Sequence, residues 1–253
     1  MRLRRARHQH TFARRRPVTP TRIHARAWRH AVLALSLATA MACAQTTVSG
    51  SISMLSEYRY RGLALSDGKA AVQLNLNLDH ASGWYGGGFA TNSSIAELKG
   101  AQLIGYAGYA QRLRSGASWE AGCTHTAYTQ WQSYDYNECY AGAALERVSA
   151  RLYYAPDYLG RNARTAYAEL NAFYPLQDGT SVIGHAGWLR TLSGLPYPGI
   201  PATSRYDARI GVSVRLGDWH AQLVRSSTQS APGYYGTQSR PAQLWILSAV
   251  YAF

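Results

Sequence analysis

Hydrophobic and polar residues alternate with a period of two along most of the chain after residue 44. In the clearest stretch, 206–216, apolar residues occupy the even positions, and most odd positions carry charged or hydroxyl side chains. The stretch 71–79 has the same form, with valine and leucines alternating with Gln73, Asn75, Asn77 and Asp79. Because successive side chains of a strand point to opposite faces, this pattern predicts β-strands with one apolar face and one wet face.

The alternation predicts twelve strands, and no segment after residue 44 has a helical period. The expected strand ranges are 47–60, 70–80, 84–93, 101–112, 118–129, 135–146, 149–155, 164–174, 181–191, 205–217, 218–228 and 241–253. On the first strand, Tyr58 and Tyr60 share the apolar parity. The longest apolar run, 31–44, is shorter than the roughly 20 residues that a transmembrane helix needs, which excludes a helical membrane protein.

The links between these strands alternate between short and long. Short links are expected at 81–83, 113–117, 147–148, 175–180 and 217–218, and the longer ones at about 61–69, 94–100, 130–134, 156–163, 192–204 and 229–240. Outer-membrane barrels have tight periplasmic turns and longer outside loops. A strand protein in lipid must also close on itself, because unpaired backbone groups cannot face hydrocarbon. The links therefore favour a transmembrane barrel over the alternative, a secreted β-sandwich.

Aromatic residues mark the expected membrane boundary. Trp84, Trp119 and Trp219 each follow a short link, at the start of a strand. Amphipathic rings are enriched at headgroup level in membrane barrels, which predicts an interface girdle. The alternative interpretation is an ordinary hydrophobic core.

The chain ends with an aromatic and apolar pattern. Its last residue is aromatic, and the alternate positions before it carry large apolar side chains, namely Trp245, Leu247, Tyr251 and Phe253. Such an ending resembles the recognition signal of the barrel-assembly machinery. We therefore expect that machinery and outer-membrane lipid as partners.

Charge is unevenly distributed along the 253 residues. The formal net charge of +13 comes from 26 basic and 13 acidic residues, but residues 1–44 hold ten arginines and no acidic residue. Without them, 16 basic residues face 13 acidic ones, which argues against a nucleic-acid partner. The leader has a basic region ending at Arg29 and His30, an apolar region at 31–40 and a small-x-small site at 42–44. This predicts a signal peptide over 1–44, cleaved after Ala44, and a barrel over 45–253. A lipoprotein acylated at Cys43 is the weaker alternative.

Two cysteines remain after cleavage. Cys123 and Cys139 are equidistant from Trp131, so a hairpin centred there places them opposite each other. A disulfide is plausible in an oxidising compartment, and two free thiols are the alternative. Two cysteines and the nearby His125 do not supply the four ligands of a structural zinc site, so we expect no metal and no cofactor.

Most charged residues lie on the wet parity, which faces the lumen of a barrel. These expected lumen-lining residues are Glu57, Arg59, Arg61, Asp79, Glu120, Glu138, Arg151, Glu169, Asp207, Arg209 and Arg215. They could line a narrow channel for passive passage of small polar solutes, or form ion pairs that fill the lumen and conduct nothing. We favour the channel.

Two other classes of function are alternatives to the channel, a structural or ligand-binding barrel and an enzyme. A structural or ligand-binding barrel could act through the outer loops, at 192–204 or at 229–240 with Tyr234 and Tyr235. The chain has no Gly-x-Ser-x-Gly motif and no recognisable Ser/His constellation, so we do not expect an enzyme.

An ordered set of short motifs resembles one protein family. The motifs run from Ser56-Glu57-Tyr58-Arg59-Tyr60-Arg61-Gly62 through Trp84-Tyr85-x-Gly87, Leu152-Tyr153-Tyr154 with Asp157-Tyr158, and Tyr174-Pro175-Leu176, to Tyr206-Asp207 with Gly211-Val212-Ser213 and Gly217-x-Trp219. Together they resemble the Gcw_chp family, proteobacterial proteins of unknown function generally taken to be outer-membrane barrels. Glu57, where aspartate is expected, and the two cysteines depart from the family pattern.

The residues and the resemblance lead to the same expectation. We expect an all-β protein, a transmembrane antiparallel up-and-down β-barrel of about twelve strands. The resemblance implies the outer membrane of a Gram-negative bacterium as its location, and it implies no catalytic residues.

Overall fold

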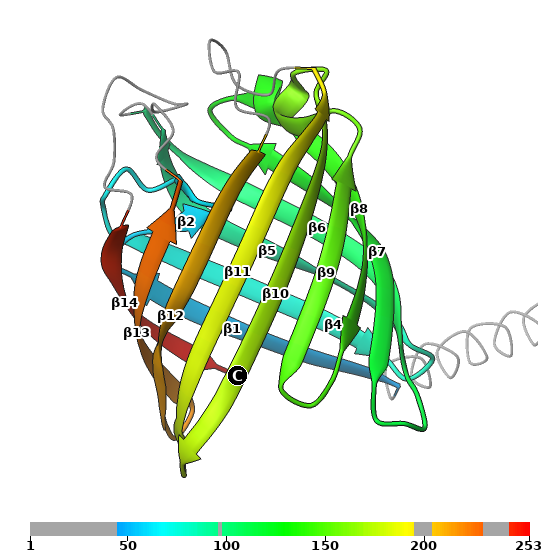
Figure 1. Ribbon diagram of the computed structural model, residues 1–253, viewed down its shortest axis with the longest axis vertical. Coiled ribbons are helices and arrows are strands. Elements are labelled where there is room, and N and C mark those ends of the chain that lie inside the picture. Colours follow the sequence, from blue (N-terminus) through cyan, green and yellow to red (C-terminus); the bar gives the residue numbers. More distant parts are fainter. Residues whose placement is uncertain (1–44, 96–97, 195–203, 230–242) are drawn as a thin grey trace, which may run out of the picture. The chain divides into compact units, whose positions relative to one another are not determined.

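The computed structural model describes residues 45–95, 98–194, 204–229 and 243–253, drawn in colour in Figure 1. These residues belong to one compact unit, Gln45–Phe253. The predicted signal peptide lies outside the described residues and stays a prediction. Within the described part of the chain, no helix has the length and apolar character needed to cross a membrane.

The described residues form a closed antiparallel barrel of twelve strands, as the alternation predicts. Each strand pairs with its neighbours in the barrel, and β1 pairs with β14 to close it. The barrel strands are β1 (Thr46–Leu55), β4 (Ala71–His80), β5 (Trp84–Ile95), β6 (Leu98–Arg112), β7 (Ser118–Tyr128), β8 (Tyr136–Ala144), β9 (Val148–Ala155), β10 (Arg164–Gln177), β11 (Thr180–Ser193), β12 (Ser204–Leu216), β13 (Trp219–Thr228) and β14 (Gln243–Ala252).

The short turns gather at one end of the barrel, which is the lower end in Figure 1. Two short 3-10 helices lie at the opposite end, η1 (Gln132–Tyr134) in the β7–β8 loop and η2 (Tyr158–Gly160) in the β9–β10 loop. One predicted long link is wrong. The β5–β6 ladder continues through Ser93↔Gly100 and Ser94↔Lys99 to Ile95↔Leu98, so polar residues assigned to a loop at 94–100 are backbone-paired strand residues.

The two faces of the barrel wall differ in polarity. On β12, Tyr206 and Ile210 are 55% and 63% exposed on the outer face, whereas Asp207, between them, is 7% exposed on the inner face. The other strands repeat this pattern, with exposed valine, leucine and tryptophan side chains outside. The buried core of the molecule is therefore inside the barrel, and the outside is apolar.

The first strand is shorter than predicted. β1 ends at Leu55, and the chain then leaves the wall to form a small separate hairpin of β2 (Arg59–Tyr60) and β3 (Leu63–Ala64). The prediction that Tyr58 and Tyr60 belong to the apolar face of the first wall strand is therefore wrong, because they leave the barrel wall and pack in or against the core inside. The local alternation of 56–61 is that of a wall strand, but its apolar side chains are buried against other strands inside the barrel.

Candidate functional site

A segment of chain crosses the lumen. We call residues 56–66 the plug segment. It starts beside β14, where the Ser56 backbone N–H donates to the Leu247 carbonyl at 2.9 Å, and its tip reaches Glu138 on β8. Around the barrel, β8 and β9 lie opposite β1 and β14. The segment therefore extends from one wall to the opposite one.

The plug segment turns through two residues of left-handed backbone. Arg61 and Gly62 have φ values of 48° and 78°, between the paired residues Tyr60 and Leu63. Two-residue hairpins of type I′ need positive φ at both central positions. Glycine adopts this conformation freely, but an arginine there is uncommon and is retained only where its surroundings hold it.

The side chain of Arg61 is held by a buried ion pair. Its Nη1 and Nη2 donate to the two carboxylate oxygens of Glu138 at 2.6 and 2.7 Å. The two side chains are 4% and 2% exposed. Burial lowers the pKa of Arg61, but the Glu138 carboxylate together with the hydroxyl groups of Tyr60 and Tyr136 raises it by more, so the pKa lies well above its usual range and the guanidinium stays charged.

Aromatic rings surround the same guanidinium. Its central carbon lies 4.3 Å from the ring centre of Tyr167, 4.8 Å from Tyr153 and 5.0 Å from Tyr60. A desolvated cation gains from contact with ring faces. Arg61 therefore links the plug segment to strands β8, β9 and β10.

Further contacts attach the plug segment to the other walls. The Tyr58 hydroxyl donates to Gln102 Oε1 on β6 at 2.8 Å, and Gln102 Nε2 donates to the Tyr128 hydroxyl at 3.0 Å. The Ser94 backbone N–H on β5 donates to the Leu65 carbonyl at 2.7 Å. The segment therefore contacts strands on several sides of the lumen. Because it lies across the lumen, it narrows the path through the barrel.

Two polar networks line the wall beside the plug segment. In one, the Glu120 carboxylate accepts from Arg151 Nε at 2.6 Å and from the Tyr85 hydroxyl at 2.8 Å. In the other, Asp207 Oδ1 lies 3.0 Å from His185 Nε2, and Asp207 Oδ2 accepts from the Tyr167 hydroxyl at 3.2 Å. Both carboxylates are thus occupied by neighbouring side chains.

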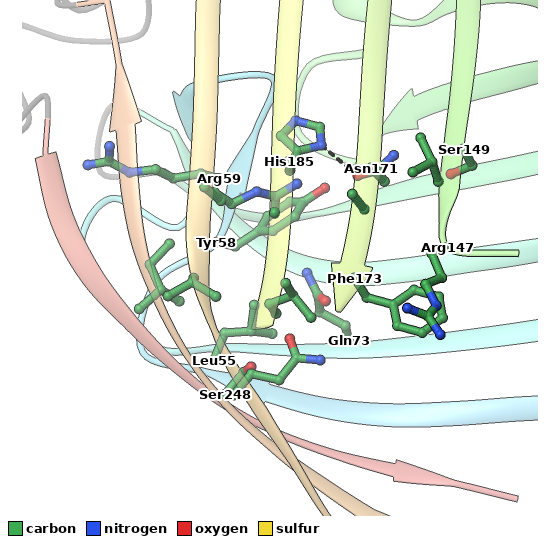
Figure 2. Close-up of a pocket in the computed structure, with 18 of the residues that line it drawn as sticks. Leu55, Tyr58, Arg59, Gln73, Arg147, Ser149, Asn171, Phe173, His185 and Ser248 are labelled. Atoms are coloured by element: carbon green, nitrogen blue, oxygen red, sulfur yellow. Dashed lines mark hydrogen bonds between the residues drawn. The ribbon is translucent and has the colours of Figure 1, made fainter. Parts of the chain in front are cut away.

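A cavity of about 440 Å³ lies between the plug segment and the short turn that joins β8 to β9. Figure 2 shows its lining, in which Tyr58 and Arg59 come from the plug segment and Gln73, Phe173 and His185 come from three different wall strands. The lining also contains Arg209 and Gln222. The cavity is therefore a chamber of the lumen with a mixed lining, in which apolar surface forms the larger part and polar and charged groups the rest.

The expected lumen residues fall into two groups. Glu57, Arg59 and Arg61 lie on the plug segment and not on the wall, and Glu57 pairs with Arg59 at 2.8 Å. The others occupy the inner parity of their strands, namely Asp79, Glu120, Glu138, Arg151, Glu169, Asp207, Arg209 and Arg215. The structure brings Arg61 together with Glu138, and Arg151 together with Glu120.

Several tyrosines fill the lumen that were not among the predicted lumen-lining residues. Tyr128, Tyr136 and Tyr167 are 2–3% exposed and belong to the core around the plug segment. A signal was present, because Tyr153 and Tyr167 share the parity of Arg151 and Glu169 on their strands. Tyrosine on a charged parity of a barrel strand can be recognised as a lumen residue, since its ring needs contacts and its hydroxyl needs a partner.

The other singled-out aromatic and apolar residues lie on the outer face. Trp84, Trp119 and Trp219 are 64%, 39% and 52% exposed near the short-turn end. At the chain end, Trp245, Leu247 and Phe253 are 57–59% exposed, and the Tyr251 ring contacts that of Trp219 at 5.1 Å. Their placement is that required of residues that face lipid, although their roles in the interface and in assembly stay predictions.

Cys123 and Cys139 are directly opposed on β7 and β8, and their sulfur atoms are bonded. Both residues are exposed on the outer face of the barrel. No group of three or more metal-ligating His, Cys, Asp or Glu side chains occurs among the described residues.

Solved structures that are similar to this chain include outer-membrane porins and channels. The KdgM porin, solved in complex with disordered oligogalacturonate, aligns with a TM-score of 0.51 at 12% identity, over 82% of this chain and 99% of that one. The NanC porin aligns with a TM-score of 0.51 at 10% identity, over 81% and 98%. The outer membrane channel DcaP of Acinetobacter baumannii gives a TM-score of 0.41 at 10% identity, over 82% and 97%.

The likeness to KdgM and NanC concerns the fold, which is that of outer-membrane porins. Among curated proteins, no sequence relative was found. The model of a family described as bacterial protein of unknown function matches residues 39–240, and the chain therefore belongs to this family, Gcw_chp.

Proposed function

We propose that the protein is a narrow channel for small polar solutes in the outer membrane of a Gram-negative bacterium, and that the plug segment restricts passage. The apolar outer face and the polar lumen support a membrane-spanning barrel. The porin fold supports the same class of function. We propose no catalytic role, and outer-membrane lipid and the barrel-assembly machinery remain the expected partners.

The observation that carries the proposal is a chamber in the lumen beside a plug segment whose strands are not part of the barrel ladder. The chamber of about 440 Å³ combines apolar side chains with amide, hydroxyl and charged groups from several strands. These polar groups can replace the water molecules around a small polar solute. The plug segment is attached to the wall by side-chain contacts and by single backbone bonds at Ser56 and Leu65, and not by a continuous ladder, since β2 and β3 pair only with each other. A barrel of this fold, KdgM, was solved with a polar solute, oligogalacturonate.

The test is single-channel recording in planar lipid bilayers, with the unaltered protein and with Arg61→Ala. We expect a small conductance from the unaltered barrel. Loss of the two bonds from Arg61 to Glu138 should raise conductance or open probability several-fold, because each bond to a charged group contributes about 1.5–3 kcal/mol to holding the segment.

Arg225→Ala is the matched control, since Arg225 lies on the outer face against Trp245 and should leave conductance unchanged. Heat-modifiable gel mobility checks that each variant is a folded barrel, and Glu138→Gln is the second variant if Arg61→Ala does not fold. Silence of the unaltered protein and of both plug variants, all folded, would overturn the channel. The non-conducting alternative would then stand, although most of its proposed loops, 192–204 and 229–240, lies outside the described residues.

A further inference from the structure

We propose that the lumen chamber is a binding site for small polar solutes that carry one carboxylate, centred on Arg209. This inference rests on the proposed channel and names the class of solute that it favours. Arg209 lies on β12, on the inner parity, directly between His185 on β11 and Ser226 on β13. Its side chain lines the chamber and is exposed to it.

Arg209 differs from the other arginines that line the chamber because no carboxylate forms an ion pair with it. Among the described residues, it makes no ion pair and no hydrogen bond through its side chain. The nearest candidate on its own strand, Asp207, is occupied by His185 Nε2 at 3.0 Å and by the Tyr167 hydroxyl at 3.2 Å. The positive charge of Arg209 is therefore directed at whatever occupies the chamber.

The acidic residues that line the chamber are also unable to neutralise Arg209. Glu57 is paired with Arg59 on the plug segment at 2.8 Å, and both side chains are nearly buried. Glu146 lies at the short turn beside Arg147, and its side chain is 87% exposed. The chamber thus holds one guanidinium in excess of the pairs that its own residues form.

The surroundings of Arg209 fit a polar solute with a single acidic group. A guanidinium offers parallel donors that match the two oxygens of one carboxylate. Gln73 and Gln222 line the same chamber, and their side-chain amides can donate to and accept from hydroxyl groups. Phe173 and Ile183 add apolar surface. The volume of about 440 Å³ suits one small molecule, because ligand pockets of about 300–1,000 Å³ hold drug-sized ligands.

The first test is the anion-to-cation permeability ratio in planar bilayers, from reversal potentials in potassium gluconate and potassium chloride gradients. A unit charge about 4 Å from an ion in a watery path changes its occupancy about fivefold. Arg209→Gln should therefore lower the ratio about fivefold, and Arg209→Lys should restore most of it. The matched control, Arg225→Gln on the outer face, should leave the ratio unchanged.

The second test is binding, measured by saturation-transfer NMR on the detergent-folded barrel. The probes are gluconate and sorbitol, two six-carbon polyols that differ by one carboxylate. We expect the gluconate signal to exceed that of sorbitol with the unaltered protein, and to fall to the sorbitol level with Arg209→Gln.

The outcomes separate this inference from the channel itself. If the barrel conducts but Arg209→Gln changes neither selectivity nor gluconate binding, the anion site is overturned and the channel stands. If the barrel does not conduct, the proposed channel is overturned, and the NMR binding experiment alone tests the anion site. A gluconate signal lost in Arg209→Gln then supports it, and equal signals from the two probes overturn it.

Discussion

Arg61 is the residue that attaches the tip of the plug segment to the opposite wall of the barrel. It is a charged side chain in left-handed backbone, buried, and paired with a residue 77 positions along the chain. A buried ion pair contributes little net stability, because desolvation offsets attraction, but breaking it by removing one partner is costly. The pair therefore specifies where the plug segment docks more than it stabilises the barrel.

A double-mutant cycle at Arg61 and Glu138 tests this asymmetry. Arg61→Leu alone leaves Glu138 buried without its partner, and we expect it to lower the free energy of unfolding by about 3–5 kcal/mol. Adding Glu138→Leu should recover part of that loss, because no unpaired charge remains. Urea unfolding in detergent micelles measures each variant. Additive losses would show that the two side chains do not interact.

The plug hairpin is an element whose position depends on one glycine. Gly62 has a φ of 78°, and a Cβ there would collide with Thr228 Oγ1 and approach Asp207 Cβ at 3.3 Å. Only a residue without a side chain fits between this tip and strands β12 and β13. The turn is therefore constrained both by its own backbone and by the wall that it faces.

Gly62→Ala should loosen the plug segment while leaving the barrel wall intact. Positive φ costs an L-residue roughly 1–2 kcal/mol, and the collision with Thr228 adds to that. Trypsin cleavage after Arg59 and Arg61, which are 7% exposed, should become faster. Gly116→Ala is the control, since Gly116 has a φ of 88° but nothing within 4 Å of its Cβ position. Equal rates of cleavage after residues 59 and 61 in the unaltered protein and in both glycine variants would contradict the docked hairpin.

The barrel as a whole separates an apolar exterior from a polar interior. Five tryptophans lie on its outer face, namely Trp84, Trp119, Trp188, Trp219 and Trp245. Trp131 instead packs against the inner core. A secreted sandwich would hide its large apolar side chains, so the exposed exterior is the feature that supports the proposed place in a membrane.

Brominated lipids test this arrangement in reconstituted vesicles. Single-tryptophan variants that retain Trp84, Trp119 or Trp219 should be quenched, and more strongly by bromine near the glycerol backbone than near the bilayer centre, because the rings are expected at headgroup level. A variant that retains only Trp131 should be quenched little. Equal quenching of all four variants would contradict the girdle.

Much of the wall can be derived from local pattern. Alternation with a period of two identifies the twelve strands, and closure is expected because a strand protein in lipid would have to pair every backbone group. The inner parity of Asp207, Arg209 and Arg215 follows in the same way. These features are predictable because the direction of a strand side chain depends only on its position along that strand.

The plug segment cannot be derived in this way. Residues 56–61 alternate as a wall strand does, and only the contacts of Tyr58 with Gln102 and of Arg61 with Glu138 show that they leave the wall. The unpaired charge of Arg209 is of the same kind, since it depends on Asp207 being occupied by side chains from β10 and β11. Alternation in the chain thus predicts which face of the wall a side chain occupies, whereas partners across the lumen depend on distances between strands far apart in sequence, which arise only when the barrel closes.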